Sequence, residues 1–201
     1  MQFAVRLKNL SLGLALVSSF SVAAASAQTL LGVNARLDRN LDSKTAAVGQ
    51  VVTAKLDGTV KTPDGLRLQR GSELVGKVDA VKSSQNGGPA SVTLLFSTAK
   101  LRDGKTIPVK VTVVAAYPQS AGGSSDGSDQ TLPPPPAQVN SDIAVQQDAG
   151  ALGKVALTSA VKNSDSGTFT RADGDFRLGA GTYLQVGIAP SATGNTSTAA
   201  E

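Results

Sequence analysis

A turn-and-strand cassette occurs twice in this chain, and it constrains the fold more than any other sequence feature. The first copy runs from Asp64 to Leu74, and the second runs from Asp173 to Leu184 with one inserted residue. Each copy reads as a turn, a short apolar-flanked strand, a second turn at glycine, and a strand that opens on Ser or Thr. The match continues to Val78 and Ile188. Such internal similarity predicts one hairpin used twice within a single β-architecture.

The N-terminus has the pattern of a secretory signal peptide. Arg6 and Lys8 form its charged region, and Leu10–Val17 form its apolar region. Ala25–Ala27 provides the small residues of a cleavage site, so we expect residues 1–27 to be removed on export. An uncleaved anchor is the alternative, but serines interrupt the apolar run too early for it to span a bilayer well. The mature chain is therefore predicted to be periplasmic or extracellular, with at most peripheral membrane contact.

Two amino acids that many functions require are absent, because the chain contains neither cysteine nor histidine. Without cysteine there is no thiol chemistry, no thiolate metal site and no lipid-anchored N-terminus. Without histidine the commonest general base and metal ligand is missing. An exported chain without disulfides relies on its apolar core, which this length permits.

Charge is unevenly placed along the chain. Without residues 1–27 the chain has 17 basic and 15 acidic residues, a formal charge of +2. No Lys or Arg lies between Lys110 and Lys154, whereas four Asp residues do. The remainder is therefore basic, which suits attraction to an acidic polymer or to lipid headgroups. A solvated basic face with no partner explains the same charges.

Apolar residues alternate with polar ones along much of the chain, as in half-buried strands. The clearest pair of strands flanks Asp103-Gly104, a dipeptide that favours tight hairpin turns. Helical periodicity is weak beyond residue 27, so the predicted fold class is all-β, a small closed or partly open barrel of short antiparallel strands. The residues predicted to share an apolar face within their strands are Val33, Ala35, Leu37, Val52, Ala54, Leu56, Val92, Leu94, Phe96, Ile107, Val109, Val111, Val113 and Ala115.

Composition divides the mature chain into a barrel and two polar segments. Residues 28–116 and 151–189 form the predicted barrel domain. Residues 117–150 are rich in Gly, Ser and Asp and contain four consecutive prolines, so they are predicted to form a flexible, disordered insertion. Residues 190–201 form a polar tail that is also predicted to be disordered. A membrane-spanning porin is disfavoured, because the five aromatic residues of the mature chain cannot form two girdles.

Three motifs of the predicted barrel resemble a known family when they are taken in chain order. They resemble the C-terminal β-barrel of the conjugal-transfer, type IV secretion core-complex family, over residues 50–116 and 151–188. The resemblance implies an envelope-facing barrel that docks with other proteins. The motifs are Leu68-x-x-Gly71-Ser72-x-Leu74-x-Gly76-x-Val78, Leu101-x-Asp103-Gly104-Lys105-x-Ile107 and Gly181-Thr182-x-Leu184-x-Val186.

The chain departs from that family in two respects. The family has a cytoplasmic segment, an inner-membrane helix and a long periplasmic arm before its barrel, and none of these is evident here. Its barrel also projects a helical antenna, whereas residues 117–150 have no helical pattern. We therefore expect a free-standing exported barrel of the same general design.

Two Ser-x-x-Lys matches are candidate catalytic residues. Ser97–Lys100 and Ser159–Lys162 match the arrangement of penicillin-binding enzymes, in which Lys helps to deprotonate the Ser hydroxyl. Both fall on predicted strands, where an odd separation sends the two side chains to opposite faces. No Ser-Asp-Asn or Lys-Thr-Gly partner motif is present. Chance occurrence is the favoured interpretation.

Three carboxylates near the second cassette are a candidate calcium site. Asp165, Asp173 and Asp175 supply the hard oxygen ligands that calcium prefers. The loop pattern of alternating ligands and a distal acidic residue is missing, so a solvated turn is the favoured interpretation.

A cluster of basic residues surrounds the first cassette. Such a cluster suits phosphate-bearing polymers, but the stacking aromatics typical of single-strand nucleic-acid binding are not interleaved with the charges. A soluble barrel exterior is the favoured interpretation. The cluster contains Lys55, Lys61, Arg67, Arg70, Lys77 and Lys82.

Taken together, these features predict an exported, non-enzymatic β-barrel module of the bacterial cell envelope that acts through protein contacts or assembly. No catalytic, cofactor-binding or metal-binding residue is assigned, and no cofactor is expected. The expected partner is an envelope protein and not a nucleic acid. The alternative is a binding domain for an anionic envelope polymer or small ligand, and a Ser-Lys hydrolase is a distant alternative.

Overall fold

The computed structural model describes residues 29–62, 65, 67–119, 134–139, 144–147 and 152–191. The predicted signal segment, much of the predicted insertion and nearly all of the predicted tail lie outside these residues. Within them every element is a strand, so no helix of the described part is long and apolar enough to cross a membrane. The strands are β1 (Leu30–Leu37), β2 (Leu41–Asp42), β3 (Val51–Leu56), β4 (Val60–Lys61), β5 (Arg67–Leu68), β6 (Glu73–Lys82), β7 (Ala90–Lys100), β8 (Thr106–Tyr117), β9 (Gln138–Val139), β10 (Ala144–Gln147), β11 (Ala156–Ala160), β12 (Gly167–Arg171), β13 (Arg177–Leu178) and β14 (Tyr183–Pro190).

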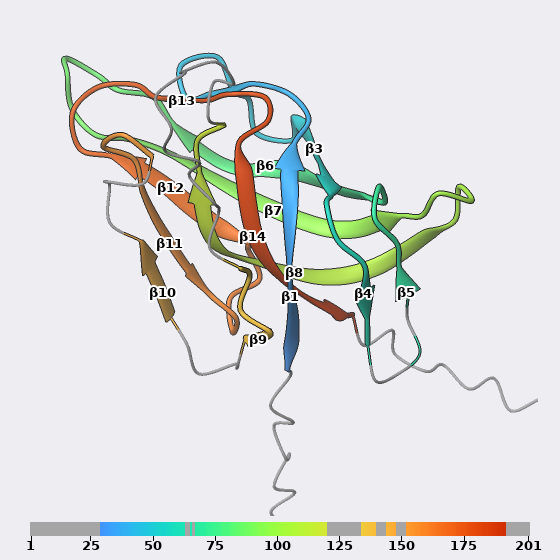
Figure 1. Cartoon of the computed structure of the whole chain (residues 1–201). Helices are drawn as coiled ribbons and strands as arrows, with labels where there is room; N and C mark the ends of the chain where they lie inside the picture. The colour runs from blue at the N-terminus through green and yellow to red at the C-terminus, as the bar shows by residue number, and fades with distance from the viewer. Residues whose placement is uncertain are drawn as a thin grey trace, which may run out of the picture.

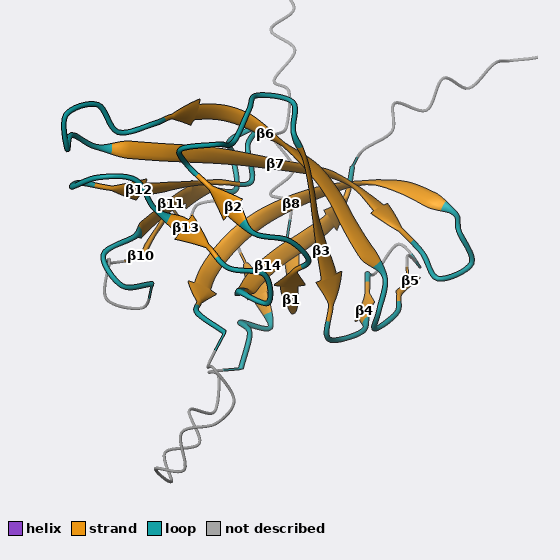
Figure 2. Ribbon diagram, turned by 90° about the horizontal axis from the view of Figure 1, so that it is seen from above, coloured by secondary structure: helices purple, strands orange, loops and turns teal. Residues whose placement is uncertain are grey.

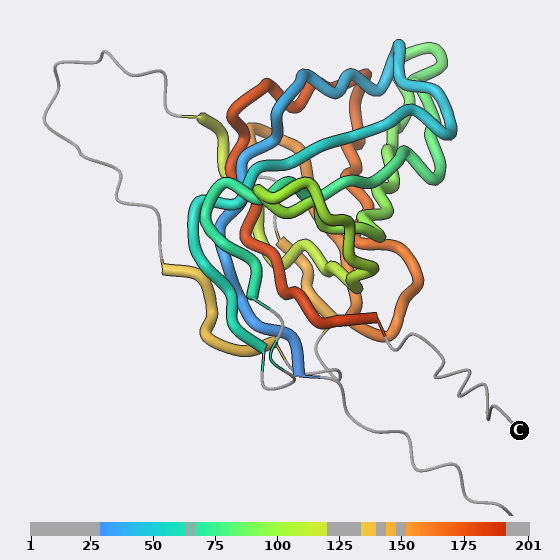
Figure 3. The backbone as a smooth tube through the Cα atoms, turned by 90° about the vertical axis from the view of Figure 1, so that its right-hand side faces the viewer, coloured from blue at the N-terminus to red at the C-terminus, as the bar shows by residue number. Residues whose placement is uncertain are grey.

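Six strands close into an antiparallel barrel (Figures 1 and 2), in the order β7-β6-β3-β1-β14-β8 and back to β7. This closure confirms the predicted all-β barrel. The first and last strands of the described chain, β1 and β14, run side by side (Figure 3). Three further strands, β12, β11 and β10, extend in that order from β7. Two short ribbons, β2–β13 and β4–β5, complete the fold together with β9, which pairs with β1.

The barrel interior is filled by aliphatic side chains from all six strands. Phe96 of β7 and Phe169 of β12 are its largest fully buried side chains. The alternation read from the sequence is confirmed in β1 and β3, where every predicted inner-face residue is buried. Each fully buried aliphatic or aromatic side chain stabilises the fold by about 1.5–3 kcal/mol. The packed core is therefore the main source of stability for this disulfide-free chain.

Bulges shift the alternation in the later strands. In the β7–β6 pairing, Ser97 has no partner, and in the β8–β14 pairing Val114 has none. An unpaired extra residue rotates the rest of the strand onto the opposite face. The core cluster therefore contains Ala116, whereas the prediction placed Ala115 on the same face as Val113. The predicted alternation is wrong beyond Val113 for this reason.

The two cassettes adopt the same backbone arrangement. Gly71 and Gly181 have φ angles of 86° and 82°, in the left-handed region that favours glycine. Gly71 N donates to Leu56 O at 2.8 Å, and Gly181 N donates to Leu37 O at 2.7 Å. In return, Leu56 N and Leu37 N each donate to the carbonyl that follows the glycine, both at 2.9 Å. The predicted internal repeat is thus confirmed for the turn. Neither cassette is itself a hairpin, because β5 pairs with β4 and β6 with β3, while β13 pairs with β2 and β14 with β1.

An approximate twofold axis relates these two turns. The antiparallel β1–β3 register pairs Arg36 with Lys55, and Leu37 and Leu56 lie symmetrically on either side of that pair. The sequences around them also match, since Val33–Asp38 and Val52–Asp57 share Val, Ala, Leu and Asp at equivalent positions. The axis therefore passes between β1 and β3, and the two glycine turns flank one surface of the barrel.

The predicted hairpin at Asp103-Gly104 is present, but its strands separate soon after the turn. β7 and β8 pair over three residue pairs, and then β12 lies against β7 in the place of β8. Ser166 joins the separated strands. Its N–H donates to Leu94 O of β7 and its carbonyl accepts from Val113 N of β8, both at 2.7 Å. Its hydroxyl accepts from Phe96 N at 2.9 Å. This one buried residue therefore supplies hydrogen-bond partners to the backbone of both β7 and β8 where the two strands separate.

Replacing Gly71 or Gly181 by Ala should lower the free energy of unfolding by about 1–2 kcal/mol, because a Cβ is strained at these φ angles. Gly179→Ala is the matched control, since Gly179 precedes the second turn, has no positive φ, and has open space where a Cβ would be added. Urea denaturation measures the free energy of unfolding of all three variants. Equal stability of Gly71→Ala and Gly179→Ala would contradict the assignment.

Ser166→Ala should lower the free energy of unfolding by about 1–3 kcal/mol, because the buried Phe96 N–H loses its acceptor. Ser164→Ala is the control on the same loop, where the exposed side chain should change stability by less than about 0.5 kcal/mol. Chemical denaturation of the two variants tests this, and similar losses in both would refute the bridging role.

Candidate binding site

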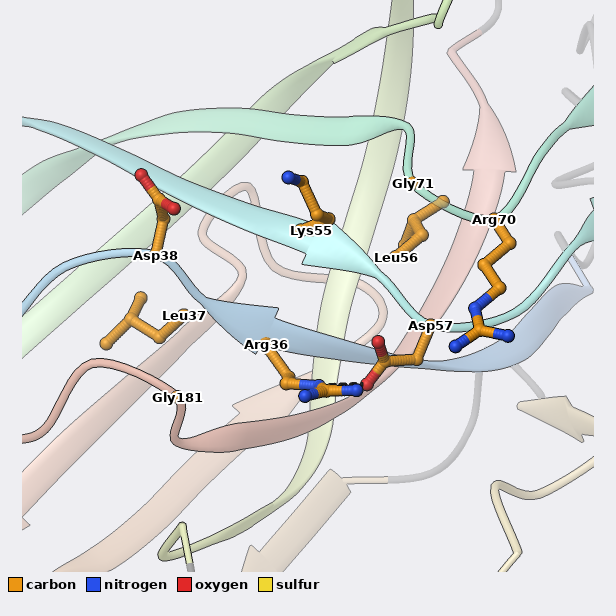
Figure 4. A pocket seen from close by; sticks show the side chains of 9 residues that line it. All are labelled: Arg36, Leu37, Asp38, Lys55, Leu56, Asp57, Arg70, Gly71 and Gly181. Carbon is orange, nitrogen blue, oxygen red and sulfur yellow. Dashed lines mark hydrogen bonds and ion pairs between the residues drawn. The ribbon is translucent and has the colours of Figure 1, made fainter.

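A surface pocket of about 380 Å³ lies where β1 and β3 end, between the two glycine turns (Figure 4). The approximate twofold axis brings charged side chains from both halves of the repeat to this one place. Three lining side chains are cationic and two are carboxylates. The lining residues are Arg36, Leu37, Asp38, Lys55, Leu56, Asp57, Arg70, Gly71 and Gly181.

Arg36 is held in the pocket by two neighbours. Its Nε donates to Asp57 Oδ2 at 2.6 Å, as the dashed line in Figure 4 marks. Its guanidinium carbon also lies 5.1 Å from the centroid of the Tyr183 ring, a cation–π distance. The hydrogen bond to Asp57 raises the pKa of Arg36, because the carboxylate favours the charged guanidinium. Both partners are partly exposed, so the ion pair orients Arg36 more than it stabilises the fold.

Lys55 and Arg70 line the same pocket without such a partner. The twofold relation that pairs Arg36 with Asp57 would pair Lys55 with Asp38, but no ion pair joins those two side chains. Arg70 likewise has no ion pair within the described part of the chain. The three cations outnumber the two carboxylates, so the pocket carries one positive charge in excess and favours an anionic group. Carboxylate and phosphate are the usual partners of such side chains.

The first Ser-x-x-Lys match lies on the barrel surface. Because Ser97 is the bulged residue of β7, Ser97 and Lys100 are both exposed, so the prediction that they point to opposite faces is wrong. The Ser97 hydroxyl lies 3.4 Å from Thr98 Oγ1, and no hydrogen bond joins it to Lys100. The structure therefore gives this pair no nucleophile–base contact.

The second match has a structural role. Ser159 of β11 is buried, and its Oγ donates to Val113 O of β8 at 2.5 Å. Lys162 lies in the turn beyond the strand and is exposed. The hydroxyl thus fastens the β10–β11–β12 layer to the barrel, as does the Gln147 side chain, which bonds both the N–H and the carbonyl of Ala116.

The three Asp residues of the candidate calcium site are not brought together. Asp175 Oδ1 accepts from Ser43 Oγ at 3.0 Å and from Ser84 N at 2.8 Å, which joins three distant loops. Asp173 pairs with Lys154 and Arg171 at the surface. Across the described residues no group of three or more acidic side chains could hold a metal ion.

The predicted basic cluster is divided by the fold. All six of its side chains are exposed, but only Lys55 and Arg70 share the pocket between the turns, and Arg67 lines another. Sequence reasoning missed Arg36 and Asp57. The repeat of Val33–Asp38 at Val52–Asp57 was the signal that could have found them.

The chain was compared with known proteins. No family model matches it, and no curated protein matches it. Among solved structures, it is similar to ComB10 of the Com type IV secretion system of Helicobacter pylori, with 13% identity and a TM-score of 0.35, over 82% of this chain and 87% of that chain. This match falls in the class that the turn motifs resemble.

The pKa of Asp173 lies below its ordinary value, first because Lys154 donates a hydrogen bond to the carboxylate. This carboxylate therefore favours the folded state above its unfolded pKa, and that contribution is lost as the pH falls through the folded pKa. Lys154→Met should raise the pKa of Asp173 toward its ordinary value, because the hydrogen bond from Lys154 is lost. An NMR pH titration measures this pKa. Lys105→Met is the control and should leave the titration midpoint of Asp173 unchanged. An unchanged midpoint in Lys154→Met would contradict the prediction.

Proposed function

We propose that this protein is an exported, non-enzymatic β-barrel module of the cell envelope that acts through contacts with other proteins. Export is supported by the charged, apolar and small-residue regions of residues 1–27. Because aliphatic side chains occupy the barrel interior, contacts with partners fall on the exterior. The observation that carries the proposal is the exposure of two aliphatic side chains, Val48 and Val51, which together are termed the Val48–Val51 surface.

Val48 and Val51 are the large hydrophobic residues that are exposed in the described part of the chain, at 67% and 66%. The turn that bears them is fixed to β6, because Gly49 N donates to Val78 O at 2.8 Å and Val78 N donates to Gln50 O at 2.9 Å. An ordered backbone therefore keeps these two side chains exposed to solvent. Their exposure supports a contact with a partner, because covering an apolar side chain removes it from water and is favourable.

A pocket of about 270 Å³ adjoins the Val48–Val51 surface. It combines apolar and polar side chains, as the core and rim of a protein interface do. Its volume is enough to accept one partner side chain beside Val51. The lining residues are Arg39, Asn40, Leu41, Gln50, Val51, Val52 and Thr53.

A photoreactive residue placed at Val51 of the full chain in its own cells should cross-link to a discrete protein of the envelope fraction. The same residue at Thr158, an exposed position on β11, is the control and should give no such adduct. Val48→Asp combined with a photoreactive residue at Val51 should abolish the adduct. The free energy of unfolding should change by less than about 0.5 kcal/mol, because Val48 is exposed. Absence of an adduct at Val51, or the same adduct at Thr158, would refute the proposal.

A second candidate function is binding of an anionic envelope polymer or small ligand. Lys55 and Arg70 favour it, because they line one pocket without an ion pair in the part of the chain described. This function uses the turn surface and leaves the Val48–Val51 surface free, so the two candidates are separable by mutation.

A further inference from the structure

We infer that a second pocket, beside the first cassette turn, binds a phosphate group through Arg67, Arg102 and Ser72. The inference rests on the second candidate function, ligand binding, and is independent of the Val48–Val51 surface. The pocket has a volume of about 360 Å³, enough for an oxyanion and part of the molecule that carries it. Its lining residues are Arg67, Gln69, Ser72, Leu101, Arg102 and Asp103.

The fold brings the two arginines together from separate elements. Arg67 belongs to β5, and Arg102 belongs to the turn between β7 and β8. The β6–β7 register joins these elements, since it pairs Glu73 with Lys100 beside both turns. The Arg102 side chain lies along the first glycine turn, with Cδ and Nε 3.9 Å from the position of a Cβ added to Gly71. Within the described chain, neither arginine forms an ion pair.

Asp103 is the one carboxylate among these lining residues, and it is engaged by a different residue. Its Oδ1 accepts from Lys105 N at 3.0 Å, and its Oδ2 lies 3.9 Å from Lys105 Nζ. These contacts close the hairpin turn and leave the two guanidinium groups uncompensated. The pocket therefore has an excess of positive charge.

Ser72 supplies a hydroxyl that the fold does not use. Only 1% of Ser72 is exposed, and its Oγ has no hydrogen-bond partner. The equivalent residue of the second cassette is Thr182, whose Oγ1 donates to Gly179 O at 2.7 Å. The same position is thus satisfied in one copy and open in the other. Because no bond holds it, rotation about the Cα–Cβ bond can direct the Ser72 hydroxyl toward a ligand in the pocket.

The donor set favours phosphate over carboxylate. Each guanidinium presents a fork of N–H donors that matches two oxygens of an anion. A phosphate monoester has three terminal oxygens and a charge near −2, so it can accept two such forks and a hydroxyl together. A carboxylate has two oxygens and a single charge, and it leaves part of this set unmatched. The phosphate can belong to a soluble molecule or to a lipid headgroup.

Titration of the full mature chain with inorganic phosphate, followed by NMR shifts of the Ser72 and Arg102 amides, tests the inference. Arg67→Gln combined with Arg102→Gln should weaken binding at least about tenfold, because each loses a charge-assisted bond. Ser72→Ala should weaken it a few-fold. The matched control, Lys77→Gln with Lys82→Gln, removes the same charge from β6 and should leave affinity within about threefold.

The source of the phosphate is distinguished with vesicles. If the protein sediments with phosphatidic acid vesicles but not with phosphatidylcholine vesicles, and if this depends on Arg67 and Arg102, the phosphate belongs to a lipid headgroup. If the protein binds inorganic phosphate but sediments with neither kind of vesicle, the ligand is a soluble molecule. The inference is overturned if the lysine control loses as much affinity as the arginine variant. It is also overturned if phosphate shifts neither amide signal and the protein sediments with neither kind of vesicle. Adducts at Val51 report on the protein contact separately, so failure here leaves that proposal standing.

Discussion

Two backbone hydrogen bonds, from Gly71 N to Leu56 O and from Gly181 N to Leu37 O, hold each cassette turn against the end of a neighbouring strand. The left-handed glycine then starts the next strand in register with that same neighbour, so β6 pairs with β3 and β14 pairs with β1. The β1–β3 pairing joins the two units. Four of the six barrel strands thus follow from two copies of one turn, and β7 and β8 close the barrel.

The parts of this fold that depend on local sequence could be predicted. Alternation in β1 and β3 and the Asp-Gly turn between β7 and β8 follow from side-chain period and turn geometry, which a few residues determine. The bulges at Ser97 and Val114 could not be predicted, because a bulge is defined against a partner strand. The separation of β7 from β8 depends on Ser166, which lies far along the chain.

The charged surface was predictable in composition but not in grouping. The sequence identifies a basic region around the first cassette, yet the pocket between the turns also needs Arg36, which reaches Lys55 only through the β1–β3 register. Arg102 reaches Arg67 only through the pairing of β6 with β7. Such contacts depend on strand order and register, which the pattern of single strands does not contain.

The approximate twofold axis also shows where the two copies differ. In the unit formed by β1 and the second cassette, Arg36 bonds to Asp57 and Thr182 bonds to Gly179, whereas Asn34 Oδ1 of β1 is buried without a partner. The equivalents of Arg36 and Thr182 in the other unit, Lys55 and Ser72, lack a partner within the described structure. A duplicated scaffold allows this division, because one copy is enough to fix the shared surface. The groups proposed to bind a ligand, Lys55 and Ser72, belong to β3 and the first cassette, and both pockets adjoin its turn. Their side chains form no hydrogen bond within the described barrel, so ligand binding there does not compete with the fold.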